Sequence, residues 1–112
     1  VVLRLVGGGI CIEEIAQILY FESNGHILQV HLADGTVLET RKSGQEMKDA
    51  LDKIAPGQFA SPNKGYIVNL AAVHMIKSDY VEIAGQELPL GKRKYRDFQE
   101  LYFQFMVTAK QM

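Results

Sequence analysis

The sequence contains one cysteine, no long apolar run and almost no net charge. With Cys11 as the single thiol, the chain cannot form an internal disulfide or a cysteine-based zinc site. Its uninterrupted apolar runs are far shorter than the roughly 18 residues that a membrane-spanning helix needs. Residues 1–7 lack both the cationic region and the small-residue cleavage site of a secretory signal. We therefore expect a cytoplasmic protein with no membrane partner.

The sequence also lacks a catalytic or cofactor-binding constellation. His26, His31 and His74 have neither the HxH nor the HExxH spacing of a metal site. The carboxylates of the adjacent pair Glu13–Glu14 point in different directions, so they do not form an acid–base pair. The run Gly7–Gly9 is not followed by the pattern of a phosphate-binding loop. The sequence therefore predicts a protein that is not an enzyme and uses no cofactor or metal.

Composition predicts one ordered domain over residues 1–112, since 47% of the residues are hydrophobic, 22% are charged and the net charge is −1. A net charge near zero does not indicate nucleic-acid binding, because nucleic-acid-binding domains usually have a surplus of basic residues. The charge is unevenly spread, however. Residues 1–56 carry 5 Lys and Arg against 8 Asp and Glu, whereas residues 57–112 carry 7 against 5. Four of these cations lie within Lys92–Arg96, which indicates either a nucleic-acid-binding segment or the solvated start of a helix.

Short apolar or alternating segments between turn residues predict many short strands. The segments 27–32 and 36–40 flank Asp34-Gly35, which is the strongest short-range signal for a hairpin. Within 27–32 the even-numbered residues are aliphatic and share one face, as in a half-buried antiparallel strand. Pro89 places its own segment at the edge of a sheet, because proline cannot donate to a strand ladder.

Two helices are predicted, at about residues 43–54 and at about residues 92–108. The first begins with the capping-box pattern Ser43-Gly44-Gln45-Glu46 and stops at Pro56-Gly57. The second carries an apolar stripe, typical of packing on a core or a partner, formed by Tyr95, Phe98, Leu101, Tyr102, Phe105 and Met106. The expected fold class is mainly β with helices: short antiparallel strands in several small packed sheets, one mid-chain helix and a C-terminal helix.

The most informative segment is Phe59–Asn69, where the polar loop 61–65 runs into an apolar strand that ends on a polar residue. Loops held by a stiff scaffold aim their side chains at a partner. Asn63 and Lys64 supply an amide and a cation, the groups best suited to base edges and phosphates. Asn63 after a proline is also ordinary turn chemistry. Asn69 is expected to bond nearby backbone.

In this order, the segments resemble the LytTR family, the DNA-binding effector domain of LytR/AgrA-type response regulators. The resemblance covers nearly the whole chain, in the segments 15–23, 25–26, 34–35, 43–54, 59, 65–70, 73–76 and 88–93. Two blocks are specific together at this separation, although neither is specific alone: the first is Phe59, Tyr66–Asn69 and Ile76, and the second is Leu88–Arg93. The resemblance implies small packed antiparallel sheets and DNA contact through loops that enter successive major grooves.

The resemblance also implies that three loops carry the DNA-binding residues, which are His26, Asn63, Lys64, Lys92, Arg93 and Lys94. Their chemistry fits. Arginine and lysine donate to guanine acceptors or phosphates, and asparagine pairs with adenine. Histidine donates from either ring nitrogen, although His26 could also be an ordinary exposed turn residue. Lys92 and Lys94 flank Arg93 and are expected to neutralise phosphates. Ala60-Ser61-Pro62 replaces a cationic or histidine-rich stretch of many members, which implies fewer phosphate contacts.

The sequence therefore predicts a sequence-specific DNA-binding domain of a bacterial transcriptional regulator, the output domain of a two-component response regulator. Its expected partners are double-stranded promoter DNA with repeated half-sites, bound by a dimer, and an attached or partner receiver domain. The alternative function is a small β-rich protein–protein interaction module that offers the Pro89 edge or the stripe at 95–106 to a partner.

Overall fold

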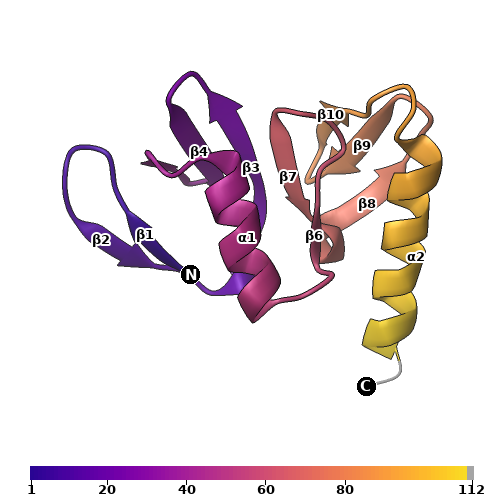
Figure 1. The fold of residues 1–112 in the computed structure, drawn as a ribbon, viewed down its shortest axis with the longest axis horizontal. Helices are drawn as coiled ribbons and strands as arrows, with labels where there is room; N and C mark the ends of the chain where they lie inside the picture. Colours follow the sequence, from indigo (N-terminus) through magenta and orange to yellow (C-terminus); the bar gives the residue numbers. More distant parts are fainter. Residues whose placement is uncertain (111–112) are drawn as a thin grey trace.

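The hairpin around Asp34 supplies two neighbouring strands at one edge of the largest sheet. The computed structural model describes residues 1–110 (Figure 1). The sheet has the order β5-β4-β3-β7-β6. Its strands are β3 (Ile18–Asn24), β4 (Ile27–Leu32), β5 (Val37–Thr40), β6 (Phe59–Ala60) and β7 (Tyr66–Asn69). The expected hairpin is present, with Thr36 N–H donating to the Asp34 carboxylate over 2.9 Å in the connecting turn.

Two smaller sheets flank this central sheet. Strands β1 (Val2–Arg4) and β2 (Ile10–Ile12) form a hairpin, and β10 (Gln86–Pro89), β9 (Tyr80–Ile83) and β8 (Val73–Ile76) pair in that order. Two single turns of 3-10 helix, η1 (Ile15–Gln17) and η2 (Leu70–Ala72), precede β3 and β8. All strand pairs in the described residues are antiparallel, and β10 is an edge strand, as Pro89 indicated. The predicted fold class is therefore confirmed.

The mid-chain helix, α1 (Gly44–Ile54), begins where its capping box predicted. The Glu46 N–H donates to Ser43 Oγ and the Ser43 N–H donates to Glu46 Oε1, each over 3.1 Å. The backbone bond from Ser43 lowers the pKa of the Glu46 carboxyl.

The C-terminal helix, α2 (Tyr95–Lys110), differs from its predicted bounds of 92–108. Lys92–Lys94 form a turn in which the Lys94 N–H donates to the Gly91 carbonyl over 2.9 Å. The Phe98 N–H then donates to the Lys94 carbonyl, which makes Lys94 the residue just before the helix. The basic run therefore lies in a loop, and the helix begins at Tyr95, three residues after the predicted start of about 92.

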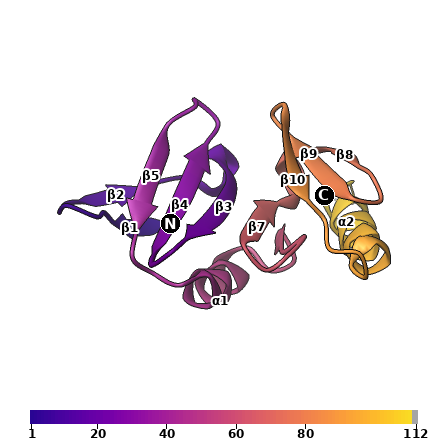
Figure 2. The same cartoon turned by 90° about the horizontal axis from the view of Figure 1, so that it is seen from above.

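Residues of the central sheet belong to two hydrophobic cores. Figure 2 shows β1 and β2 on one side of this sheet and the three-stranded sheet with α2 on the other. The first lies between the sheet, α1 and β1, and contains Phe21, Leu51 and Leu3. The second lies between the opposite face of the sheet, the three-stranded sheet and α2, and contains Val68, Val81 and Phe98 among others. Successive residues of β7 serve different cores, since Ile67 belongs to the first and Val68 to the second.

The stripe of α2 is only partly used for packing. Phe98 is buried, and Tyr95, Tyr102 and Phe105 pack half-buried against the second core, whereas Leu101 is 46% exposed. Cys11 is half-buried, and its Sγ donates to Glu13 Oε1 over 3.2 Å.

Asn69 has the structural role that the sequence predicted. It is buried at the end of β7, and its Nδ2 donates to the Ile18 carbonyl over 2.8 Å. Its Oδ1 accepts from the Ala71 N–H over 3.0 Å, which caps η2. One side chain thus ties the start of β3 to the turn that leads into the three-stranded sheet.

Candidate nucleic-acid interface

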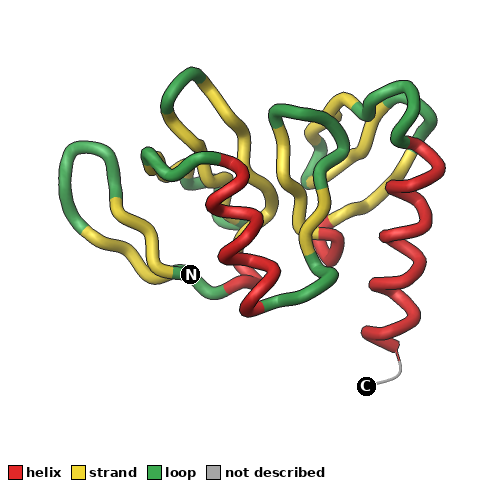
Figure 3. The backbone as a smooth tube through the Cα atoms, in the orientation of Figure 1, coloured by secondary structure: helices red, strands yellow, loops and turns green. Residues whose placement is uncertain are grey.

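Three loops lie at one edge of the molecule. They are the turn Gly25-His26 between β3 and β4, the loop 61–65 between β6 and β7, and the loop 90–94 between β10 and α2. All three lie at the upper end of the molecule in the view of Figures 1 and 3. We call these three loops together the loop edge. The sequence predicted that its DNA-binding residues would come from these loops, and the strand packing brings the loops to the same edge.

Backbone hydrogen bonds join the three loops into a continuous edge. The Ser23 N–H donates to the Gly65 carbonyl over 2.8 Å, which joins the end of β3 to the middle loop. The Gly91 N–H donates to the Pro62 carbonyl over 2.9 Å, which joins the last loop to the other side of the middle loop. The middle loop is therefore fixed to both neighbours, and the spacing of the side chains along the edge is set by main-chain bonds.

His26 lies at the tip of a two-residue turn and is exposed. Asn24 pairs with Ile27 across the hairpin, so Gly25 and His26 are the two residues that connect the strands. Gly25 has a φ of +65°, a conformation that glycine adopts freely and that two-residue hairpin turns require. The imidazole is thus held away from the sheet on a short, well-defined turn.

Asn63 uses its amide group to hold two loops together. Its Nδ2 donates to the Pro89 carbonyl, and its Oδ1 accepts from the Gly65 N–H over 3.1 Å. The second bond is the turn chemistry that the sequence allowed as an alternative to DNA contact. Asn63 therefore positions the neighbouring residues, with one amide N–H left over for a ligand.

Lys64 is the exposed residue of the middle loop. The Tyr66 N–H donates to the Asn63 carbonyl over 3.2 Å, which closes a tight turn around Lys64. Pro62 is buried at the start of the same loop and anchors it. The lysine therefore projects from a loop whose backbone is fixed on both sides.

Lys92, Arg93 and Lys94 form the exposed turn that leads into α2. Lys94 differs from the other two, because it lines a hollow between α1 and α2 together with Lys48, Asp52 and Leu101. A Cβ on Gly91 would lie at ordinary van der Waals distance from its neighbours, 3.5 Å from Lys94 Cγ and 3.7 Å from the Pro62 carbonyl oxygen, so the last loop lies directly beside the middle one. Lys92 and Arg93 are the cations of this turn that lie outside that hollow.

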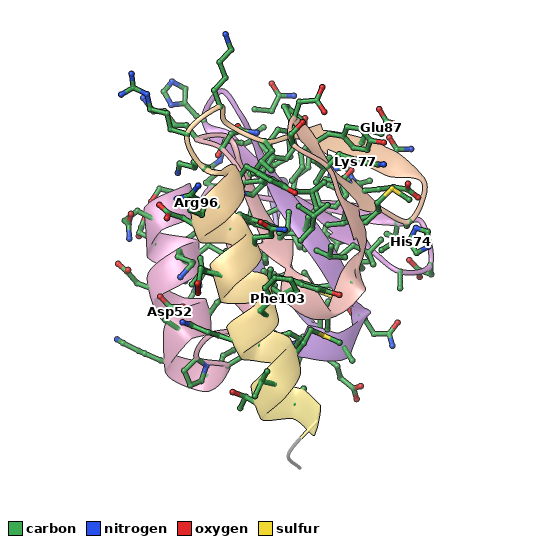
Figure 4. All side chains as sticks on the ribbon, turned by 90° about the vertical axis from the view of Figure 1, so that its right-hand side faces the viewer. Asp52, His74, Lys77, Glu87, Arg96 and Phe103 are labelled. Carbon is green, nitrogen blue, oxygen red and sulfur yellow. The ribbon has the colours of Figure 1, made fainter. Side chains whose placement is uncertain are left out.

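The cations of the loop edge have no carboxylate partner within the described residues. The ion pairs within residues 1–110 are Lys48–Asp52 at 2.8 Å and two histidine–glutamate pairs, His31–Glu22 at 3.2 Å and His74–Glu82 at 3.1 Å. Lys64 and the turn 92–94 belong to none of them. In the stick view of Figure 4, nitrogen-tipped side chains project from the upper loops. An edge with unpaired cations attracts anions even though the whole chain is near neutral.

A polar network beneath the loop edge was not anticipated from the sequence. Glu22 accepts from the Tyr66 hydroxyl over 3.2 Å and lies 3.2 Å from His31 Nε2. The His31 ring stacks on Tyr20 with ring centroids 4.1 Å apart. Burial raises the pKa of Tyr66, and the negative charge of Glu22 adds to this shift. These contacts fix β3, β4 and β7 relative to one another just below the loops.

Residues 1–110 contain no group of three or more His, Cys, Asp or Glu side chains that could hold a metal ion. None of the helices in this part of the chain is long and apolar enough to span a membrane.

Comparison with known proteins agrees with the sequence resemblance. The family model described as LytTr DNA-binding domain matches residues 8–103. A solved LytTr DNA-binding domain from Bacillus cereus, described as part of a methyl-accepting/DNA response regulator, has a similar fold with a TM-score of 0.73. The two chains are 20% identical, and the match covers 90% of this chain and 94% of that one. No curated protein matches. The family match over most of the chain shows that the protein belongs to the LytTR DNA-binding domain family.

Proposed function

We propose that this protein is the sequence-specific DNA-binding domain of a bacterial transcriptional regulator and that it grips double-stranded DNA with its loop edge. The observation that carries the proposal is the continuous row of three loops, hydrogen-bonded to one another, that presents exposed and unpaired cations. A row of fixed cations suits a DNA backbone, because phosphate contacts hold a protein in register on the duplex.

Each residue of the loop edge has a role in this proposal. His26 and Arg93 lie in the two outer loops, where they would meet base edges in successive major grooves. Lys64 lies in the middle loop, between those two contacts. Lys92 and Lys94 would neutralise phosphates, with Lys94 the weaker because it lines a hollow on the side of the molecule. Asn63 would act chiefly by positioning Lys64 and the last loop.

The arrangement of the helices favours loops over a recognition helix. Helix α1 packs on the face of the central sheet through Met47 and Leu51. Its first turn is closed by the capping box of Ser43 and Glu46. Helix α2 starts at the loop edge and runs away from it, as Figure 1 shows. Neither helix runs along the edge where the loops lie.

Affinity measurements on loop variants test the proposal. A duplex selected from a random library would be titrated with the protein and followed by fluorescence anisotropy. Arg93→Ala should cost about 1–3 kcal/mol and relax the preference at one base position. Lys92→Ala should weaken all duplexes alike and reduce the salt slope by about one unit. Lys53→Ala, at the far end of α1, is the control and should change neither. If Lys64→Ala and Arg93→Ala both retain full affinity, the loop edge is not the binding surface.

Two copies of the domain would bind two half-sites in the proposed complex. In support, α2 exposes apolar side chains that its own chain does not cover: Phe103 is 58% exposed and Val107 is 56% exposed. Phe103 lies on the outer surface of the helix (Figure 4). A duplex with both half-sites should bind two copies with positive cooperativity, and sedimentation of the complex would measure this stoichiometry.

The domain would serve as the output of a two-component response regulator, with a receiver domain attached or supplied by a partner. The family and the description of the Bacillus cereus relative support this role. The full-length reading frame and the effect of acetyl phosphate on DNA affinity would test it. A receiver segment with phosphorylation-dependent affinity supports the role, and a regulator without any receiver partner contradicts it.

The exposed apolar surface of α2 supports a second candidate function, that of a protein–protein interaction module. Salt dependence separates the two candidates. Binding through phosphates weakens steeply as salt rises, whereas apolar docking does not and instead shows a negative heat-capacity change.

A further inference from the structure

The connection between β5 and α1 carries two cations that the sequence resemblance did not assign. Arg41 and Lys42 follow the last residue of β5 and precede the helix cap Ser43. Both side chains are exposed. Neither forms an ion pair within residues 1–110. Folding therefore leaves two adjacent positive charges in solvent without a partner.

The strand register places these cations beside the turn that carries His26. The β4–β5 ladder ends with Leu28 opposite Thr40, and Arg41 and Lys42 follow directly after this last pair. The two cations and His26 line one shared hollow together with Ser23 and Gly44. A side chain on Gly44 would lie 3.6 Å from Ser23 Oγ, which shows how closely the connection approaches the turn.

The positive surface continues beyond this hollow toward the N-terminal hairpin. A second groove is lined by Arg41, Lys42 and Arg4, with Gly7 and Gly8 of the β1–β2 loop on its wall. Arg4 is also exposed and unpaired within the described residues. The cations therefore form a strip that extends the loop edge on the side of His26, opposite to the side of Arg93.

The first turn of α1 does not provide a free anion-binding site beside these cations. The Glu46 carboxylate already accepts the Ser43 N–H over 3.1 Å, so the helix start is occupied by its own side chain. Lys42 contributes only the smallest of the effects that lower the pKa of Glu46. Any anion at this place would therefore be held by the side chains of Arg41 and Lys42.

We propose that Arg41 and Lys42 bind backbone phosphates of DNA beside the major groove that His26 would enter. These contacts would lengthen the stretch of duplex that the protein covers on that side. This inference rests on the proposed function of the loop edge. Exposed cations beside a base-reading loop act on phosphates, which fix the register and carry no sequence information. The two residues would thus raise affinity for all duplexes equally.

Salt titrations of the double variant Arg41→Ala/Lys42→Ala test this inference. Because the variant can no longer neutralise two phosphates, the slope of log K against log salt should fall by about two. Affinity near 0.1 M salt should fall by on the order of ten-fold for selected and random duplexes alike. Arg41→Lys keeps the charge and should retain most of the affinity. Lys53→Ala is the matched control, an exposed cation about 15 Å along α1 from Ser43.

A second readout locates the contacts on the DNA. Methylphosphonate linkages, which carry no charge, would replace single phosphates on either side of the His26 half of the site. A neutral linkage at the contacted position should weaken the unaltered protein and leave the double variant unaffected. Thermal unfolding should be nearly the same for both proteins, because neither side chain forms an ion pair within residues 1–110.

The outcomes separate this inference from the proposed function. If the double variant keeps the full salt slope while Arg93→Ala weakens binding, the loop edge binds DNA and the strip does not. If the unaltered domain shows no salt-dependent affinity for any duplex, the proposed function itself is wrong and the inference fails with it.

Discussion

Replacing the buried Asn69 by alanine tests how strongly one side chain holds the scaffold of the loop edge. Its Nδ2 donates to the carbonyls of Ile18 over 2.8 Å and of Ile15 over 3.3 Å. Its Oδ1 accepts from the Ala71 N–H over 3.0 Å and from Gln58 Nε2 over 3.1 Å. With 2% of its surface exposed, the amide has no access to replacement water.

The expected cost follows from these four bonds. Each hydrogen bond contributes about 0.5–1.5 kcal/mol net, and a buried group left without a partner costs about 1–3 kcal/mol. Alanine would remove a partner from the backbone of Ile18 and of Ala71, while the half-buried Gln58 can turn to solvent. We therefore expect Asn69→Ala to lower the free energy of unfolding by about 3 kcal/mol. Gln58→Ala removes one of the four bonds and should cost less than about 1 kcal/mol.

Urea denaturation followed by circular dichroism measures this difference. For a slope m of about 2 kcal/mol per molar urea, the midpoint should fall by about 1.5 M with m unchanged. A loss below about 1 kcal/mol for Asn69→Ala, or a loss equal to that of Gln58→Ala, would refute the reasoning that this network anchors β7 to β3.

Four further predictions concern single residues. Ser43→Ala should cost about 1 kcal/mol in chemical denaturation, because the α1 capping box is lost. The pKa of Glu46 is lowered in the folded protein, so the stability that its carboxylate contributes is present above its ordinary pKa and is lost as the pH falls through the lowered value. The loss of unfolding free energy caused by Glu46→Gln should therefore shrink in urea titrations below about pH 4. Ala84→Asn should stabilise by about 0.5–1 kcal/mol, since Ala84 has a φ of +48° in a turn that favours Asn-Gly. Phe103→Ser should reduce cooperativity on two half-sites in anisotropy titrations and leave single-site affinity unchanged. An unchanged free energy of unfolding for Ser43→Ala or Ala84→Asn, or a cost of Glu46→Gln that does not vary with pH, would contradict the role given to that residue. Unchanged cooperativity for Phe103→Ser would contradict a role for α2 in pairing two copies.

Local signals allowed most elements to be predicted from the sequence. The capping box gave the start of α1 to the residue, because its bonds lie within one helical turn. The alternation in 27–32 gave β4 and its buried face, since one face of the strand meets the first core. The Asp34-Gly35 turn joined β4 to β5 as expected.

Features that depend on tertiary contacts could not be predicted in the same way. The basic run at 92–94 looked like a helix start, but its turn is held by Gly91, whose own N–H is bonded to the distant Pro62. Leu101 belongs to the apolar periodicity of α2 yet stays exposed, because it lines the hollow between α1 and α2, whereas Tyr102 and Phe105 pack against the second core. Sequence periodicity identifies an apolar face but not what covers it.

In the candidate site, too, the sequence identified residues and loops but not the contacts made by the folded chain. The sequence and the family resemblance named His26, Lys64 and Arg93, and the strand order places their three loops together. The amide of Asn63 is instead bonded to Pro89, which lies far away in the sequence. The cations at 41 and 42 gave no signal of their own, because they share a hollow with His26 only in the folded chain.

The most direct test of the loop edge is an NMR titration of the isotope-labelled domain with a selected duplex. Amide shifts should change first and most strongly at residues 23–27, 61–66 and 90–95, with smaller changes at 40–44. Changes concentrated on the outer surface of α2 and on β8, with the three loops unaffected, would contradict the account.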